Sequence, residues 1–199
     1  MMDITREHTD PRILRTRLLI KEAFVELLQE MDIGKISVSR IAERATISRV
    51  TFYLHYRDIS DMLEKIADDM IQDIHRVMTS ETVNEESAED TNWLIIEQLL
   101  NHIAEHANFY KVTLASRKAP IFTERLLNML TELITKRLED LESDNSFYKA
   151  GIQKDIAIWY GSSALIGTIV SWLRNDMPYT PHFLAKQFDL LIHNQDKNS

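Results

Sequence analysis

The chain has 199 residues, of which 44% are hydrophobic and 27% are charged, so it can bury a core and is not compositionally disordered. Four glycines and four prolines are too few for a β-sandwich, a barrel or a doubly wound sheet, all of which need many special turns, and an all-α fold is expected. The absence of cysteine excludes disulfides, thiolate metal sites and cysteine nucleophiles.

The net charge of −8 is unevenly distributed along the chain. Residues 1–57 carry ten Lys or Arg against eight Asp or Glu, whereas residues 58–199 carry thirteen against twenty-three. Neighbouring charges dominate within a Debye length of about 8–10 Å, so the overall acidity does not exclude nucleic acid as a partner. The first residues lack the pattern of a secretory signal, and a cytoplasmic location is expected.

The first half of the chain predicts four helices. Apolar residues at a spacing of three and four favour an amphipathic helix over 13–31. Two segments follow, 38–44 and 48–54, which are too short to be stable alone and must be held by packing. A longer helix over 58–78 is expected to join an N-terminal domain, residues 1–57, to a C-terminal domain, residues 58–199.

The second half predicts further helices near 90–107, 109–116, 121–142, 149–174 and 180–193. The stretch 156–173 carries no charge and is at the lower limit of a membrane span. Small and polar residues dilute it, so a helix that is covered by protein on most sides is preferred to a membrane helix. Its small residues allow close backbone approach and its large residues supply contact area, which predicts a subunit interface at Gly161, Ala164, Gly167, Val170 and Trp172.

The two short segments fit a helix-turn-helix, in which the second helix lies in the major groove of DNA and the first braces it. Ala42 supplies the small residue where the helices cross. Ser37 and Ser48 can cap the helix N-termini, whose free N–H groups attract phosphates. The exposed residues of the second helix and its end are expected to touch DNA; they are Arg49, Val50, Thr51, Tyr53 and His55.

The run Ser37-x3-Ile41-Ala42-x2-Ala45-x-Ile47-Ser48-x2-Thr51-Phe52-Tyr53-x-His55-Tyr56 resembles the N-terminal signature of TetR-type transcriptional regulators. The resemblance covers about residues 12–66. It implies a homodimer with one helix-turn-helix per subunit, bound to double-stranded DNA, and a helical ligand-binding domain behind it. It also implies site roles: Arg49 and Thr51 would approach base edges, Ser37, Tyr53 and His55 would hold phosphates, and Ser39 is a further candidate.

The sequence departs from the TetR pattern at two positions. Thr46 stands where the family usually has glycine, and a β-branched residue resists a positive φ, so a different or strained turn is expected. Ile59 stands where the family commonly has lysine. Arg57 is the candidate to replace the phosphate contact of that lysine.

Beyond residue 90, Phe109-Tyr110-Lys111, Gly167, Trp172-Leu173 and Tyr179-Thr180-Pro181 are similar to the C-terminal domain of one TetR subgroup. That subgroup includes relatives of the dihydroxyacetone-kinase operon regulator, which works with a protein co-regulator, so the effector can be a small molecule or a protein. Seven residues either line an effector cavity or fill the core; they are Met70, Trp93, Phe109, Tyr110, Phe122, Met129 and Trp159.

Nothing in the sequence indicates an enzyme, because it has no glycine-rich phosphate loop, nucleophile elbow or spaced metal motif. His102 and His106 are four residues apart, but nothing fixes a third metal ligand, so no metal or cofactor is expected. The sequence predicts a homodimeric repressor that an effector releases from a palindromic operator. The alternative is a protein-interaction or ligand-binding module with an atypical helix-turn-helix, acting as a co-regulator-dependent activator.

Overall fold

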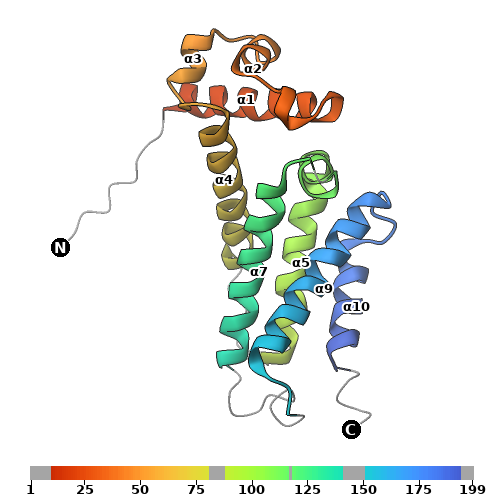
Figure 1. The fold of residues 1–199 in the computed structure, drawn as a ribbon. Helices are drawn as coiled ribbons and strands as arrows, with labels where there is room; N and C mark the ends of the chain where they lie inside the picture. Colours follow the sequence, from red (N-terminus) through yellow and green to blue (C-terminus); the bar gives the residue numbers. More distant parts are fainter. Residues whose placement is uncertain (1–9, 81–87, 117, 141–150, 194–199) are drawn as a thin grey trace, which may run out of the picture. The chain divides into compact units, whose positions relative to one another are not determined.

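The computed structural model describes residues 10–80, 88–116, 118–140 and 151–193, and all regular elements in these ranges are helical (Figure 1). The contacts divide the chain into two compact units, Met1–Ile66 and Ala67–Ser199. The division lies within helix α4 (Ile59–Ser80), nine residues beyond the boundary placed at residue 57 from sequence.

The N-terminal unit contains α1 (Pro11–Glu30), a single 3₁₀ turn η1 (Ile33–Lys35), α2 (Val38–Arg44), α3 (Arg49–Tyr53) and the start of α4. Helix α1 begins where the Asp10 carboxylate accepts the N–H of Arg12 at 2.9 Å, with Pro11 at the first helical position. The core of this unit joins all four helices; its fully buried side chains include Ile20, Phe24, Leu28, Ile41, Phe52 and Met62. This core holds α2 and α3, as their short lengths require.

The turn between α2 and α3 is built around Thr46, whose φ is 55°. The N–H of Thr46 donates to the carbonyl of Glu43 at 3.1 Å, and the N–H of Ile47 donates to the carbonyl of Ala42 at 2.9 Å. These bonds satisfy carbonyls at the end of α2. The left-handed residue that the family pattern requires is therefore present although it is threonine, and the turn is closed.

The C-terminal unit contains the rest of α4, α5 (Ala88–Glu105), α6 (Ala107–Tyr110), a π-helical turn η2 (Lys111–Ala115), α7 (Pro120–Asp140), α9 (Lys154–Arg174) and α10 (Pro181–His193). Helix α5 packs mainly along α10, and α7 packs mainly along α9 (Figure 1). The segment η2 contacts both α7 and α9.

The end of α9 is tied to η2 by polar contacts. Lys111 pairs with Asp176, and Arg174 Nε donates to the carbonyl of Ala115 at 2.9 Å. Trp172 Nε1 donates to the carbonyl of Tyr179 at 2.9 Å, which fixes the connection between α9 and α10. Two residues in that connection, Asp176 and Met177, have positive φ.

Candidate nucleic-acid interface

Serine caps position the two short helices. Ser37 Oγ accepts the N–H of Arg40 at 3.4 Å, and Ser48 Oγ accepts the N–H of Thr51 at 3.0 Å. Ser48 Oγ also lies 2.9 Å from Thr51 Oγ1, so the two hydroxyls share a hydrogen bond. Both serines therefore act as the caps predicted from sequence, and the Thr51 hydroxyl is held in one orientation.

Helix α3 has one buried side and one exposed side. Phe52 is fully buried, and Tyr53 packs edge-on against it with ring centroids 5.7 Å apart. Tyr53 is nevertheless 57% exposed, and Arg49 is also exposed. The side of α3 that faces away from the core thus presents an aromatic hydroxyl and a guanidinium, both of which bind nucleic acid readily.

The Arg49 side chain reaches from α3 back to α2. Its Nη1 donates to Ser39 Oγ at 3.5 Å, and both residues are exposed. Ser39, the further candidate from sequence, therefore lies beside Arg49, one of the two candidates for base contact. The contact is long for a hydrogen bond, and it leaves the guanidinium able to turn toward another acceptor.

His55 lies at the end of α3 among cationic groups. Partial burial, and next to it the positive charge of Arg17, lower the pKa of the His55 imidazole below its usual value. Arg17 comes from α1, and its Nε is buried with no hydrogen-bond partner among the described residues. Lys65 Nζ donates to the His55 carbonyl at 3.3 Å. Arg17 and Lys65 were not predicted from sequence, because only the fold brings them to His55.

Arg57, the candidate replacement for the family lysine, is engaged within its own unit. Its N–H donates to Asp61 Oδ2 at 2.9 Å, and its guanidinium lies 3.2 Å from Asp61 Oδ1. Lys65 Nζ is 3.0 Å from the same carboxylate, and these contacts hold the pKa of the Asp61 carboxyl below its ordinary value. The Arg57 side chain remains 81% exposed, so the ion pair orders it at the surface beside the start of α4.

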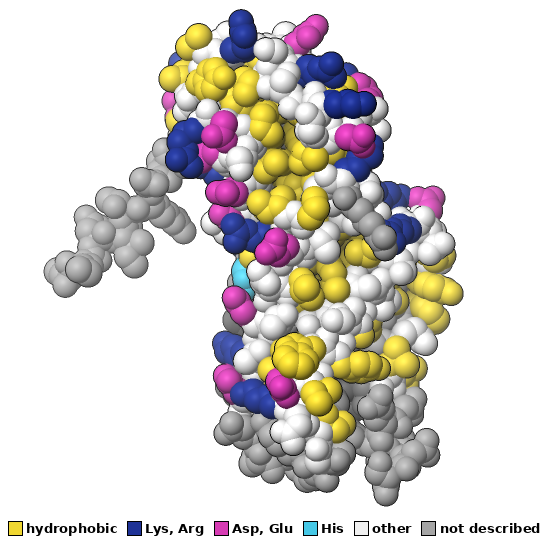
Figure 2. All heavy atoms as spheres, in the orientation of Figure 1, with side chains coloured by type: hydrophobic (Ala, Val, Ile, Leu, Met, Phe, Trp, Pro, Cys, Tyr) yellow, Lys and Arg dark blue, Asp and Glu magenta, His cyan; other side chains and the backbone are white. Residues whose placement is uncertain are grey.

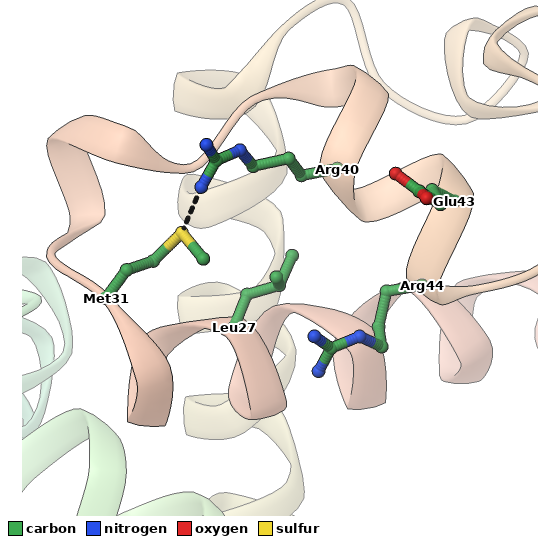
Figure 3. A pocket seen from close by; sticks show the side chains of 5 residues that line it. All are labelled: Leu27, Met31, Arg40, Glu43 and Arg44. Atoms are coloured by element: carbon green, nitrogen blue, oxygen red, sulfur yellow. Dashed lines mark hydrogen bonds between the residues drawn. The ribbon is translucent and has the colours of Figure 1, made fainter.

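A small open pocket lies between α1 and α2, lined by Leu27, Met31, Arg40, Glu43 and Arg44 (Figure 3). Arg40 Nη1 lies 2.9 Å from Met31 Sδ, a weak acceptor. Arg44 pairs with Glu26 at 3.1 Å and with Glu30 at 2.9 Å. These carboxylates occupy the Arg44 guanidinium, so it braces α2 against α1 rather than adding free positive charge to the unit.

Most of the residues proposed for an effector cavity pack into the core of the C-terminal unit. Phe109 and Phe122 meet edge to face with ring centroids 5.5 Å apart, and Met70, Tyr110 and Met129 are also buried. Burial raises the pKa of the Tyr110 hydroxyl, and the charge of Asp73 adds to this effect. The side chain of Trp93 lies outside the described residues.

The two tryptophans of α9 have environments that differ from the expectation. Trp159, proposed to line a cavity, is 63% exposed, and Trp172, proposed for the subunit interface, is 4% exposed within its own chain. Aromatic and aliphatic residues of α9 lie on several sides of the helix, so its sequence does not indicate which side faces the core. Val170 is half-buried.

The small residues of α9 divide between two sides. A Cβ at Gly161 would lie 3.3 Å from Ile134 Cδ1 of α7, so this glycine serves the contact between α7 and α9. Ala164 and Gly167 are exposed. Several further apolar residues of α9 and α10 are exposed but were not predicted from sequence, namely Ile156, Tyr160, Phe183, Leu190 and Leu191.

The exposed apolar side of α9 could face either a membrane or another protein surface. By length and composition α9 could cross a membrane, and only 28% of its apolar window is buried, so within its own chain it is not covered on most sides as the sequence led us to expect. The structure packs α9 along α7 and η2, and hydrophobic side chains form patches on the face shown in Figure 2. The rings of His102 and His106 have centroids 4.7 Å apart and are tilted by 58°, but the described residues contain no group of three or more side chains suited to a metal ion.

Comparison with known proteins gives two family matches. Residues 20–66 match the model described as bacterial regulatory proteins, tetR family, and residues 91–194 match the model described as transcriptional regulator C-terminal region. The chain is 28% identical over 175 residues to the uncharacterized HTH-type transcriptional regulator YxbF of Bacillus subtilis (strain 168). This match covers 84% of the chain but only 42% of that relative.

Two solved structures share the fold over nearly their whole length. The transcriptional regulator FadR from Bacillus subtilis, in complex with stearoyl-CoA, aligns with a TM-score of 0.64 at 23% identity, over 88% of this chain and 97% of that one. The dihydroxyacetone kinase operon activator DhaS aligns with a TM-score of 0.59 at 22% identity, over 92% and 96%. At such identities the likeness shows the fold alone.

Proposed function

The chain belongs to the TetR family of bacterial helix-turn-helix transcriptional regulators, a family of non-enzymatic proteins, and we propose that it is a homodimeric repressor that an effector releases from a palindromic DNA operator. The observation that carries the proposal is α3, which is anchored by Phe52 and capped by Ser48 while its outer side is exposed. The protein would act in the cytoplasm, where bacterial DNA lies.

In this proposal α3 enters the major groove. Arg49 reads base edges, since a guanidinium can donate two hydrogen bonds to guanine O6 and N7, and Ser39 steadies it. Tyr53 and His55 hold phosphates, with Ser37 at the start of α2. Arg57 adds a further phosphate contact. Phosphate contacts fix the register on the duplex, and the base contact supplies sequence preference.

The second subunit would cover the exposed apolar side of α9 and α10. Trp159 and Tyr160 are 63% and 65% exposed, and Leu191 is 68% exposed. Large apolar side chains that gather on a surface mark an interaction site. A two-fold dimer places two α3 helices on successive turns of the major groove, about 34–36 Å apart, and so requires a palindromic operator.

The effector would bind in the C-terminal unit. The solved FadR relative holds stearoyl-CoA, and the aromatic and methionine residues around Phe109 and Phe122 suit an apolar ligand. These side chains are in contact, so a ligand would have to part them. An effector that moves the binding-competent population from 99% to 1% must prefer the released state by about 5.5 kcal/mol.

The direct test is binding of the full chain to fragments tiled across the DNA upstream of its own gene. Competition with random DNA at two salt concentrations should reveal one preferred palindromic fragment, with affinity falling steeply as salt rises. Tyr53→Ala should weaken binding to all fragments alike, whereas Arg49→Ala should also reduce the preference for the cognate fragment. If no fragment is preferred and a selection from random duplexes also finds none, operator binding is refuted.

Loss of the complex on adding stearoyl-CoA, with coenzyme A as the control, would support release by an acyl effector. Loss only with a partner protein would favour a protein co-regulator instead. Increased transcription on binding, rather than block of transcription, would replace the repressor by an activator.

A further inference from the structure

The outermost side chains of α3 and of its C-cap residue, Leu54, are apolar. Val50 is 71% exposed and Leu54 is 78% exposed, the highest values among the large hydrophobic residues of the described chain. At 3.6 residues per turn they lie about 40° apart around the helix, and their midpoint is opposite the buried Phe52. They therefore point directly away from the core, between Arg49 and Tyr53 on one side and Thr51 on the other.

This pair cannot read DNA by hydrogen bonds, because neither side chain has a donor or an acceptor. Exposed branched side chains on the helix that faces DNA gain free energy only where the duplex offers an apolar surface. In the major groove the base edges offer one such group, the C5 methyl of thymine.

We propose that Val50 and Leu54 are specificity-determining residues that contact the C5 methyl groups of thymines in each half-site of the operator. The inference rests on the proposed function and extends it to a chemical feature of the operator. Residues four apart on a helix have Cβ atoms about 5–6 Å apart, and bases rise about 3.4 Å per step, so the two thymines lie at adjacent or next-adjacent positions. Leu54 thereby gains a role that the sequence did not suggest.

The test removes single methyl groups from the DNA. An operator is first selected from random duplexes with the full chain, and each thymine of one half-site is then replaced in turn by deoxyuridine. This exchange deletes the methyl and keeps every hydrogen-bonding group. Binding is measured by fluorescence anisotropy for the wild-type chain, Val50→Ala, Leu54→Ala and Tyr53→Ala, and circular dichroism melting confirms that the variants are folded.

The wild-type chain is expected to lose about fourfold in Kd at one or two thymines, the effect of losing one buried methyl-sized group. Val50→Ala and Leu54→Ala should each bind the thymine operator more weakly and no longer distinguish thymine from uracil at one position. Tyr53→Ala is the matched control on the same side of α3, and it should lower affinity for both duplexes while keeping their ratio.

Three outcomes overturn the proposal. The first is a wild-type chain that binds every uracil duplex as tightly as the thymine duplex. The second is an unchanged ratio in both Val50→Ala and Leu54→Ala, and the third is a ratio lost in Tyr53→Ala alone. A selected operator with no methyl effect refutes this inference but leaves the regulator intact, whereas a selection that yields no preferred sequence refutes both.

Discussion

Thr46 holds a backbone conformation that its own side chain resists. With φ at 55° it is in the left-handed region, where a residue other than glycine costs on the order of 1–3 kcal/mol. The surrounding bonds from Thr46 to Glu43 and from Ile47 to Ala42 impose this conformation. The helix-turn-helix therefore keeps its geometry at the expense of stability.

Thr46→Gly is expected to raise the free energy of unfolding by about 1 kcal/mol, since relief of strain exceeds the added chain entropy of glycine. Urea denaturation followed by circular dichroism measures the change. Thr46→Ala is the control, because alanine removes the β-branch but still disfavours positive φ. A glycine variant that is less stable than the wild-type chain would contradict the account of a strained turn.

His55 is expected to make both the stability of the protein and its proposed DNA binding depend on pH. Its lowered pKa means that folding favours the neutral imidazole. The contribution of His55 to stability is therefore complete above its usual pKa of about 6.5 and is lost as pH falls through the lowered value. A bound phosphate favours the charged imidazolium instead, so operator affinity should rise as pH falls from about 7.5 to 5.5.

Replacement of His55 by glutamine should flatten both pH profiles, because the group that titrates is removed. Anisotropy at constant ionic strength measures operator affinity, and urea midpoints at the same pH values measure stability. Tyr53→Ala should keep the slope of affinity with pH while lowering affinity throughout. If His55→Gln keeps the wild-type slope, another group takes up the proton.

At the scale of the elements, α3 depends on its cap. It has five residues, so one hydrogen bond from Thr51 N–H to Ser48 Oγ satisfies a large share of its free backbone donors. Ser48→Ala should lower the free energy of unfolding by about 1 kcal/mol and weaken operator binding.

Ser48→Asp separates these two effects. Aspartate is as good a cap as serine, so stability should be near that of the wild-type chain, but its charge would repel the phosphates and weaken operator binding further than alanine does. Thermal melting and anisotropy on the same three proteins test this. An aspartate variant that binds DNA as tightly as the wild-type chain would show that the start of α3 does not approach the duplex.

The limits of a helix were predictable from sequence where its apolar residues recur on one side. They were harder to predict where the apolar residues are spread around the helix. The first helix, the two short helices and α4 all lie within two residues of their expected limits. The apolar spacing identified each of them, and Ser37 and Ser48 also marked the starts of the two short helices. Helix α9, expected over 149–174, spans Lys154–Arg174, so its end was predicted but its start was not. Its apolar residues are not confined to one side, so the sequence did not show which side faces the core. The different environments of Trp159 and Trp172 follow from this.

The candidate DNA-binding site likewise has features that were predictable from sequence and features that were not. The positions of Ser48, Thr51 and Tyr53 relative to one another were predictable, because all three lie in one short helical segment and helical spacing fixes their arrangement. The approach of Arg17 to His55 and the pairing of Arg57 with Asp61 depend on packing and on side-chain conformation, which spacing does not determine. Leu54 was missed because an apolar residue in a helix usually belongs to the core.

At the scale of the whole molecule, acidity and DNA binding are compatible because charge is segregated. Residues 1–57 carry a net charge of +2, and residues 58–199 carry −10. Repulsion between the acidic C-terminal unit and DNA is screened over about 8 Å at physiological salt, while the proposed phosphate contacts at α3 would be direct. A single helix-turn-helix with so few cations binds weakly, so tight operator binding requires two copies in one complex.

Dimerisation and operator binding should therefore fail together. In the double variant Trp159→Glu, Leu191→Glu, two-fold symmetry would bury four carboxylates in the proposed interface, where each costs several kcal/mol. The dimer should weaken by a factor of about 100 or more, and sedimentation equilibrium measures the change. Operator affinity should fall with it, while the melting of each subunit changes little because both side chains are exposed.

Leu14→Glu is the matched control, since Leu14 is 53% exposed on α1 and lies outside the C-terminal unit. It should leave the dimer intact. A double variant that still sediments as a dimer would place the interface elsewhere, and a wild-type chain that sediments as a monomer would refute the homodimer. If the double variant is monomeric but binds the operator with full affinity, each half-site is bound independently, and operator binding does not require a dimer.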